Sequence, residues 1–233
     1  MSKGEYRYAE RGLGQRIVYR TCRAIAFVFL KVCFRFRRRG LEKLPKTGAY
    51  LLVANHQSYL DPPIVGCCVH NRQFVPMARI GLFDGKLFGA LIRALNSIPV
   101  DSSKGDTGAM RKTLAALEQG FPVCVFPEGA RSPDGAIHEF KRGAALILKR
   151  SKCPVVPVAI EGAYDAWPRH AKRPRVFRHR VEVLIGEPIA HEDLGDEPLA
   201  TMERAVRDLH ASLRETMGKT PLVAPDSPAA DEG

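Results

Sequence analysis

The stretch AYLLVANHQSYLDPP (residues 49–63) joins a short apolar run to a polar cluster and then to two prolines. The first part, Ala49–Ala54, is continuous, apolar and bounded by turn residues, which is typical of a strand buried on both faces. Pro62 and Pro63 favour the first turn of a helix, with Asp61 placed to cap its N-terminus. The polar residues between them therefore lie where a strand of an α/β sheet ends, which is the usual place for a ligand site.

The rest of the chain repeats this alternation of strand and helix. Further strands are predicted over Phe74–Ala78, Ile98–Val100, Pro122–Phe126, Val155–Ile160 and Val181–Ile185, and helices over Thr107–Gln119, Gly143–Arg150 and Leu199–Met217. We therefore expect an α/β domain over residues 41–217, with a mixed, largely parallel sheet flanked by helices. Residues 218–233 are rich in proline, alanine and acidic residues, and are expected to form a disordered tail.

Residues 1–40 are predicted to form a separate, basic helical arm. Residues 1–43 carry 12 Lys and Arg against 3 Asp and Glu, whereas the remaining residues of the chain are close to neutral. No Gly or Pro interrupts residues 15–39. At 100° per residue, one stripe of this segment contains the apolar side chains Val18, Cys22, Ile25, Phe29, Val32 and Phe36. The opposite side carries the cations Arg16, Arg20, Arg23, Lys31 and Arg38.

The amphipathic pattern of the arm has two interpretations. The longest uncharged run, Ala24–Leu30, is much shorter than the ~20 apolar residues of a membrane span, so a transmembrane helix is not expected. The helix either docks its apolar stripe on the main domain or lies in the plane of an anionic membrane surface. The consecutive arginines Arg37–Arg39 favour the membrane. The residues expected to contact it are Arg16, Arg20, Arg23, Ile25, Phe29 and Phe36.

Two polar segments carry candidate chemistry. His56 is a candidate general base, and Asp61, five positions later, is placed to accept the imidazole N–H and fix its tautomer. The alternative is that Asp61 only caps a helix and His56 is an ordinary loop residue. In the second segment, Phe126–Ser132 (FPEGARS), Gly129 allows backbone to approach a ligand closely, and Arg131 offers a planar fork suited to phosphate. The alternative there is a polar turn with a surface Glu–Arg pair.

In combination, these segments resemble the glycerolipid acyltransferase family, whose members acylate lysophosphatidic acid or glycerol 3-phosphate. The family's motifs N-H-x-S-x-x-D, F-P-E-G-x-R-S and V-P-V-x-I match Asn55–Asp61, Phe126–Ser132 and Val156–Ile160, and its F-K-x-G segment matches Phe140–Gly143. The resemblance implies transfer of an acyl chain from acyl-CoA or acyl carrier protein to the sn-2 hydroxyl of 1-acyl-sn-glycerol 3-phosphate. The product would be phosphatidic acid, and neither a cofactor nor a metal ion is implied.

The resemblance also implies roles for individual residues. His56 would be the base and Asp61 its orienting partner. Arg131 would bind the substrate phosphate, and Glu128 is expected to orient Arg131 or to accept a glycerol hydroxyl. Gly129 and Ser132 would shape the same site, with Lys104 and Lys141 as secondary cations. Ser58 is expected to stabilise the loop rather than to act as a nucleophile.

One block of the chain departs from the family pattern. The family has an apolar strand that ends in Asp-Arg, and that Arg is assigned to the substrate phosphate. Here the corresponding stretch is Ser97–Ser102, so Ser102 replaces the Arg, and Lys104 is the nearest cation that could substitute. The identity of the acyl acceptor is therefore open. Another lyso-lipid, such as a lyso-ornithine lipid, or glycerol 3-phosphate itself remains an alternative.

Charge and cysteine content bear on partners and location. The net charge of +11 leaves a non-catalytic lipid- or nucleic-acid-binding protein as an alternative from another class, but its concentration in the arm argues against a nucleic-acid groove. A second basic cluster, between Arg169 and Arg180, either contacts headgroup or coenzyme A phosphates or is a solvated loop. The six cysteines lack zinc-site spacing and predict a reducing compartment.

These observations predict a peripheral enzyme on the cytoplasmic face of a bacterial inner membrane. Its expected partners are an anionic membrane surface, an acyl thioester (acyl-CoA or acyl carrier protein) and a lysophospholipid, and no nucleic acid is expected.

Overall fold

The computed structural model describes residues 12–69, 74–95, 97–101 and 107–222. Its main sheet contains β1 (Arg37–Arg39), β2 (Leu51–Ala54), β5 (Val123–Val125), β6 (Val155–Glu161) and β7 (Glu182–Ile185), in the order β1-β7-β6-β2-β5. Neighbouring strands run parallel except β6 and β7, which are antiparallel. The predicted α/β fold with a mixed, largely parallel sheet is confirmed.

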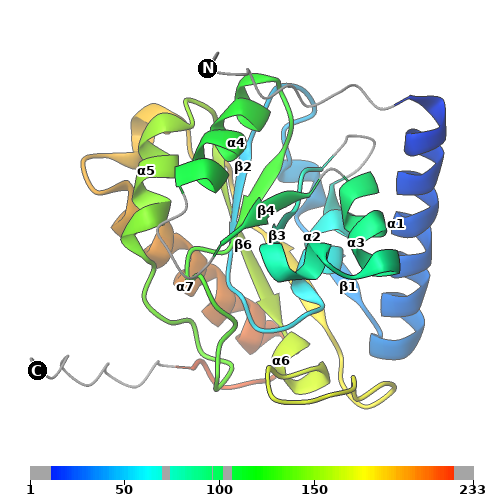
Figure 1. Ribbon diagram of the computed structural model, residues 1–233. Helices are drawn as coiled ribbons and strands as arrows, with labels where there is room; N and C mark the ends of the chain where they lie inside the picture. Colours follow the sequence, from blue (N-terminus) through cyan, green and yellow to red (C-terminus); the bar gives the residue numbers. More distant parts are fainter. Residues whose placement is uncertain (1–11, 70–73, 96, 102–106, 223–233) are drawn as a thin grey trace, which may run out of the picture.

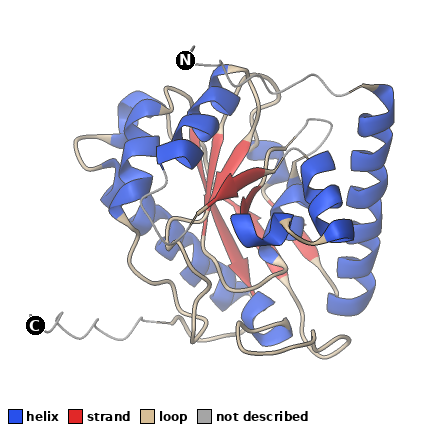
Figure 2. Ribbon diagram, viewed as in Figure 1, coloured by secondary structure: helices blue, strands red, loops and turns tan. Residues whose placement is uncertain are grey.

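Helices cover both faces of this sheet (Figure 2). On one face lie α1 (Leu13–Phe34) and α2 (Asp61–Cys68), and on the other lie α4 (Thr107–Glu118), α5 (Arg142–Arg150) and α7 (Pro198–Thr216). Strand β2 serves both layers because successive side chains alternate across a strand. Leu52 and Ala54 pack with the first group of helices, whereas Leu51 and Val53 pack with the second. This double burial explains why the strand is apolar throughout.

A smaller parallel sheet pairs β3 (Met77–Arg79) with β4 (Ile98–Val100). A bridge between Val75 and Val123 links it to the main sheet. The segment between its strands forms η2 (Ile80–Phe83) and α3 (Lys86–Ala94), elements that the sequence analysis did not predict. Three further short helices complete the described chain: η1 (Leu41–Lys43), α6 (Ala163–Ala166) and η3 (His191–Leu194).

The N-terminal arm differs from its predicted form, because α1 ends at Phe34 and not at Arg39. Arg35 adopts a left-handed backbone conformation (φ 48°), which turns the chain. Phe36 is then only 1% exposed, and the three arginines that follow form β1 at the edge of the main sheet. The helical periodicity of the sequence extends through Phe36, but the Phe36 side chain packs in the hydrophobic core after the helix has ended.

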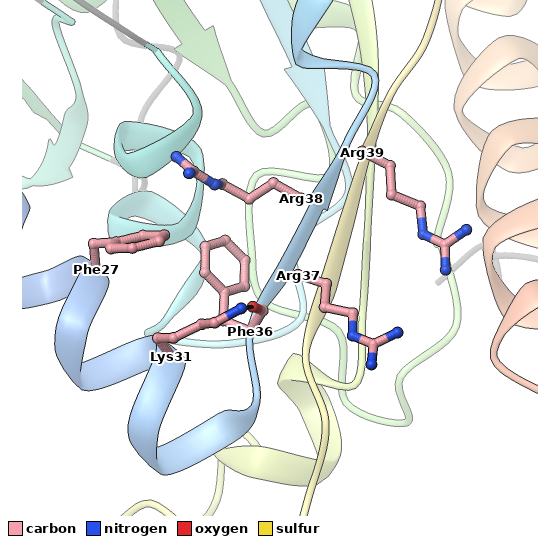
Figure 3. A pocket seen from close by; sticks show the side chains of 6 residues that line it. All are labelled: Phe27, Lys31, Phe36, Arg37, Arg38 and Arg39. Atoms are coloured by element: carbon pink, nitrogen blue, oxygen red, sulfur yellow. Dashed lines mark hydrogen bonds between the residues drawn. The ribbon is translucent and has the colours of Figure 1, made fainter.

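The arginines of β1 are oriented by the alternation of the strand (Figure 3). Arg38 points toward α1, donates a hydrogen bond to the carbonyl of Cys67 (2.6 Å) and lies 4.4 Å from the centre of the Phe27 ring. Arg39 points the other way and pairs with Glu182 at 3.1 Å. These residues border a pocket of about 420 Å³. Two arginines of the triplet that favoured the membrane interpretation therefore have partners within the fold.

The inner face of α1 is docked on the domain, at the right-hand edge of Figure 1 beside α2 and α3. Leu30 and Phe34 are fully buried, and Arg23 donates a hydrogen bond to the carbonyl of Val69 (2.8 Å). Arg23 and Phe36, both expected to contact a membrane, therefore face the domain instead. The rest of the expected set remains outward: Arg16, Arg20, Ile25 and Phe29 are exposed. Within the described residues, no helix is both long and apolar enough to span a bilayer.

The C-terminal tail is described only as far as residue 222. Lys219 lies 2.8 Å from Glu161 and 2.7 Å from Asp165, so the first residues of the predicted disordered segment are tied to the domain. Residues 223–233 lie outside the described part of the chain.

Candidate active site

The loop between β2 and α2 brings together the predicted base and its partner. Nδ1 of His56 lies 2.8 Å from Oδ2 of Asp61. Asp61 is completely buried, whereas the His56 side chain is 19% exposed and stacks on the ring of Phe126. Since a carboxylate only accepts hydrogen bonds, this contact fixes the proton on Nδ1. Nε2 has no hydrogen-bond partner among the described residues, so its lone pair is available to a substrate.

Asp61 holds the whole loop and not only the imidazole ring. The same Oδ2 accepts the backbone N–H groups of Gln57 (2.6 Å) and Ser58 (2.7 Å). The expected N-cap is not formed, because Asp61 is itself the first residue of α2 and its side chain makes no cap hydrogen bond. The carboxylate instead turns back onto the preceding loop, which fixes the backbone that carries His56.

Glu128 fixes this loop from the other side. Its Oε1 accepts the backbone N–H of His56 (2.7 Å), and its Oε2 accepts that of His138 (3.0 Å). Both oxygens are thus used by the backbone, and the expected role of orienting Arg131 is not what the structure shows. Burial raises the pKa of Glu128 to about 8, although the two N–H donors lower it. Glu128 therefore joins the loop of His56 to the loop of His138.

Two amide side chains that the sequence analysis did not single out also hold the site. Asn55 donates to the carbonyl of Ile160 (2.9 Å) and accepts its N–H (2.8 Å), which joins the end of β2 to β6. Gln57 donates to the carbonyl of Gly135 (2.8 Å). Both amides are buried, and their place directly after a buried strand was the signal that could have identified them.

Arg131 and the residues around it form the second half of the site. Its guanidinium lies 3.5 Å from the centre of the Tyr59 ring, which belongs to the His56 loop. Gly129 has a positive φ of 69°, and a Cβ there would lie 3.1 Å from the Lys141 side chain. A larger residue at position 129 would therefore strain the turn and displace the lysine.

Of the remaining predicted site residues, most lie together at one pocket and one lies outside the described chain. Glu128, Arg131, Ser132 and Lys141 all line one pocket of about 430 Å³. The Ser132 hydroxyl is engaged by Asp134 (2.9 Å) and by the N–H of Gly135 (2.8 Å), so it shapes the loop. Lys104 lies outside the described residues. Among the described residues, no three His, Cys, Asp or Glu side chains gather as metal ligands would.

A second buried histidine–carboxylate pair lies close by. Nε2 of His210, on α7, lies 2.8 Å from Oε2 of Glu161, at the end of β6. Arg214 and Lys219 also contact this carboxylate, at 2.9 Å and 2.8 Å. Burial alone raises the pKa of Glu161, but His210 and Lys219 lower it to about 2. This cluster is internally neutralised, and it braces α7 against the sheet.

Comparison with known proteins identifies the family. The family model described as "Acyltransferase" matches residues 35–161, which include both polar segments. The chain belongs to the acyltransferase family. It is 26% identical over 194 residues to the 1-acyl-sn-glycerol-3-phosphate acyltransferase of Bacillus subtilis, covering 81% of this chain and 93% of that one. It is 30% identical to the alpha form of the mouse enzyme of the same name, covering 74% and 61%.

Solved structures agree with this assignment. The crystal structure of the 1-acyl-sn-glycerophosphate (LPA) acyltransferase PlsC from Thermotoga maritima is similar, with a TM-score of 0.73 and 25% sequence identity, over 91% of this chain and 86% of that one. This acyltransferase is therefore an enzyme, and the alternative of a non-catalytic lipid- or nucleic-acid-binding protein is set aside.

Proposed function

We propose that this acyltransferase transfers an acyl chain from a thioester to the sn-2 hydroxyl of 1-acyl-sn-glycerol 3-phosphate, giving phosphatidic acid. The observation that carries the proposal is the contact between Nδ1 of His56 and buried Asp61, which leaves Nε2 without a hydrogen-bond partner among the described residues. The names of the relatives from Bacillus subtilis and mouse support the same acceptor.

The proposed reaction needs one base and no enzyme nucleophile. Nε2 of His56 takes the proton of the sn-2 hydroxyl as that oxygen attacks the thioester carbonyl. An ester C–O bond forms, the C–S bond breaks, and the thiolate leaves and is protonated by the imidazolium or by water. Asp61 stabilises the imidazolium in between, as the carboxylate does in serine hydrolases. Strong acid assistance is unnecessary because a thiol has a pKa of about 8.5.

The acceptor is tested with a panel of lyso-lipids. We expect purified protein and one acyl-CoA to acylate lysophosphatidic acid faster than glycerol 3-phosphate or a lyso-ornithine lipid, and a parallel set with acyl carrier protein would identify the donor. Good transfer to the phosphate-free acceptor without transfer to lysophosphatidic acid would reject the proposed acceptor and favour the lyso-ornithine alternative that Ser102 motivates.

We further propose that the enzyme acts at an anionic membrane surface. Fifteen large apolar side chains are exposed in the described chain, and eleven of them lie on α1 and on the η2–α3 segment. They include Ile25, 64% exposed, and Leu87, 88% exposed. Helix α1 contains no acidic residue, and its outer cations are Arg16, Arg20 and Lys31. An exposed apolar face beside cations is the pattern of an interfacial helix.

Point substitutions test this proposal better than removal of the arm, because Leu30, Phe34 and Phe36 are part of the core. We expect the double variant Ile25→Glu and Val32→Glu to lose flotation with anionic vesicles while keeping the circular dichroism spectrum of the wild type. Leu146→Glu, at an exposed apolar position on α5, is the matched control and should still float. Equal flotation of the double variant and the control would refute membrane binding through α1.

A further inference from the structure

The pocket beside the His56 loop carries more positive charge than the family's motifs account for. Besides Arg131 and Lys141, it is lined by Arg142 and Arg169, against the two carboxyl groups of Glu128 and Glu139. Among the described residues, no carboxylate pairs with Arg142 or Arg169, and Nη1 of Arg131 is buried without a hydrogen-bond partner. Four cations with this much unsatisfied hydrogen-bonding capacity form a site suited to a phosphate.

The backbone just before Arg169 contacts the loop that bears His56. Two residues before it, the carbonyl of Trp167 accepts a hydrogen bond from the Ser58 hydroxyl (2.8 Å). The Trp167 ring also lies 5.2 Å from the ring of Tyr59, on whose face Arg131 lies. The loop that bears His56 therefore contacts Arg131 directly and meets the chain two residues before Arg169.

The structure separates Arg169 from the basic residues that follow it. In the described loop, Lys172, Arg173, Arg175 and Arg178 are not among the residues that line the pocket, and Arg180 pairs with Glu182. Only Arg169 of this cluster reaches the site.

Arg142 approaches the pocket from another element. It is the first residue of α5, a helix of nine residues, and Lys141 precedes it without a side-chain cap. The unpaired N–H groups and the dipole of the first turn add to the positive potential of the side chains. The cations thus converge from three segments: the FPEGARS turn, the start of α5 and the Trp167 loop.

We propose that Arg169 and Arg142 complete the phosphate site for the acyl acceptor, and that they take over the contact which the family assigns to the Arg that Ser102 replaces here. This inference rests on the proposed function. The acceptor phosphate is the anion that fits, because only a short glycerol segment separates it from the hydroxyl that must reach Nε2 of His56. Glu128, which borders the pocket, also binds the backbone N–H of His56.

Steady-state kinetics on the full chain provide the first test. We expect Arg169→Ala to raise KM for lysophosphatidic acid about 10- to 100-fold, the equivalent of one charge-assisted hydrogen bond, with little change in kcat. Turnover of 1-monoacylglycerol, which lacks the phosphate, should be the same in Arg169→Ala as in the wild type. Arg142→Ala should also raise KM for lysophosphatidic acid, but by a smaller factor. Lys172→Ala, in the same loop but outside the pocket, is the matched control and should match the wild type.

A binding measurement separates this inference from the proposed reaction. Trp167 is the single tryptophan of the chain and lies two residues from Arg169, so its fluorescence reports on this loop. We expect glycerol 3-phosphate to change the emission of the wild type and of Lys172→Ala but not of Arg169→Ala. If the wild type binds but does not acylate lysophosphatidic acid, the proposed function fails and the subsite stands. If Arg169→Ala matches Lys172→Ala in KM and in fluorescence, the subsite is refuted.

Discussion

Two histidine–carboxylate pairs with the same 2.8 Å spacing lie at neighbouring strand ends, yet the structure gives them different surroundings. His56 contacts Asp61 through Nδ1, so the outer nitrogen of its ring faces away from the carboxylate. His210 contacts Glu161 through the outer nitrogen, Nε2, and Arg214 and Lys219 share that carboxylate. A short histidine–carboxylate contact alone therefore does not identify a general base. A general base also needs a ring nitrogen that a substrate can reach and a carboxylate that no other cation neutralises.

The two pairs are also supported differently. Asp61 is surrounded by backbone N–H groups of its own loop, which hold it in place without adding a full positive charge. Glu161 is surrounded by ionic side chains from α7 and the segment after it. In the part of the chain that the structure describes, no Lys or Arg pairs with Asp61, so the imidazolium of His56 is the cation that forms beside it, which suits proton transfer. In the second arrangement Arg214 and Lys219 neutralise the Glu161 carboxylate, which suits a structural contact between α7 and the sheet.

The largest effect is expected for Asp61→Ala. This substitution removes the group that orients His56 and stabilises its protonated form, so kcat for acyl transfer should fall about 10²- to 10⁴-fold. The measurement is a thioester-release assay on the purified variant. Asp165→Ala, which removes a partly exposed carboxylate of the Glu161 cluster, serves as control and should keep its turnover.

Glu161→Gln should act on stability instead of on turnover. Removing the carboxylate of this buried cluster leaves the cations Arg214 and Lys219 without this counter-charge, and we expect the free energy of unfolding to fall by about 3–5 kcal/mol. Urea unfolding followed by circular dichroism measures the change. A loss of kcat as large as that of Asp61→Ala, in protein that is still folded at the assay temperature, would show that the two pairs are not functionally distinct.

The two buried glutamates, Glu128 and Glu161, should give opposite pH dependences of stability. The pKa of Glu161 is about 2 in the folded protein against 4.5 for the free group, so its contribution is present above pH 4.5 and is lost as the pH falls toward 2. The pKa of Glu128 is raised to about 8, so its contribution is present below pH 4.5 and is lost as the pH rises toward 8.

The test compares unfolding free energies of the wild type and of two Gln variants across pH. The advantage of the wild type over Glu161→Gln should shrink between pH 4.5 and 2. Relative to Glu128→Gln, the wild type should lose stability between pH 4.5 and 8. Parallel pH profiles for the three proteins would contradict this contrast.

Ser58→Ala is expected to have the smallest effect. Its buried hydroxyl joins the His56 loop to the carbonyl of Trp167, so its loss should cost about 1 kcal/mol of stability and leave kcat within an order of magnitude. A fall in kcat comparable to that of Asp61→Ala would instead point to a covalent role for Ser58.

The sequence predicted the elements whose signals are local. The apolar run of β2, its parallel neighbours β5 and β6, and the polar loop after β2 are all predictable from residues 49–63, 122–132 and 155–160, because burial on two faces leaves a continuous apolar run. The spacing of His56 and Asp61 made them a candidate pair, and the resemblance to the acyltransferase family favoured that pairing over a simple helix cap. The Glu161–His210 pair did not, because its partners are 49 positions apart in the chain and meet only when α7 packs on β6.

The N-terminal segment shows the opposite case. Periodicity predicted one helix through Arg39. Most of the predicted apolar stripe, including Val18, Ile25, Phe29 and Val32, does lie together on the exposed face of α1. The end at Phe34 depends on Arg35 adopting a left-handed conformation and on β7 offering an edge to residues 37–39, and neither is visible locally. The backbone contact of Glu128 and the place of Arg169 in the pocket likewise depend on loops that meet only in the folded chain.

The most direct test of the proposed mechanism is to compare kcat for His56→Ala and His210→Ala under identical conditions, with lysophosphatidic acid and one acyl-CoA. Of these two histidines, His56 is the one whose Nε2 has no hydrogen-bond partner among the described residues, so we expect kcat to fall about 10²- to 10⁴-fold in His56→Ala and to stay near the wild-type value in folded His210→Ala. Full turnover by His56→Ala, or equal losses in the two variants, would contradict a mechanism in which His56 is the base.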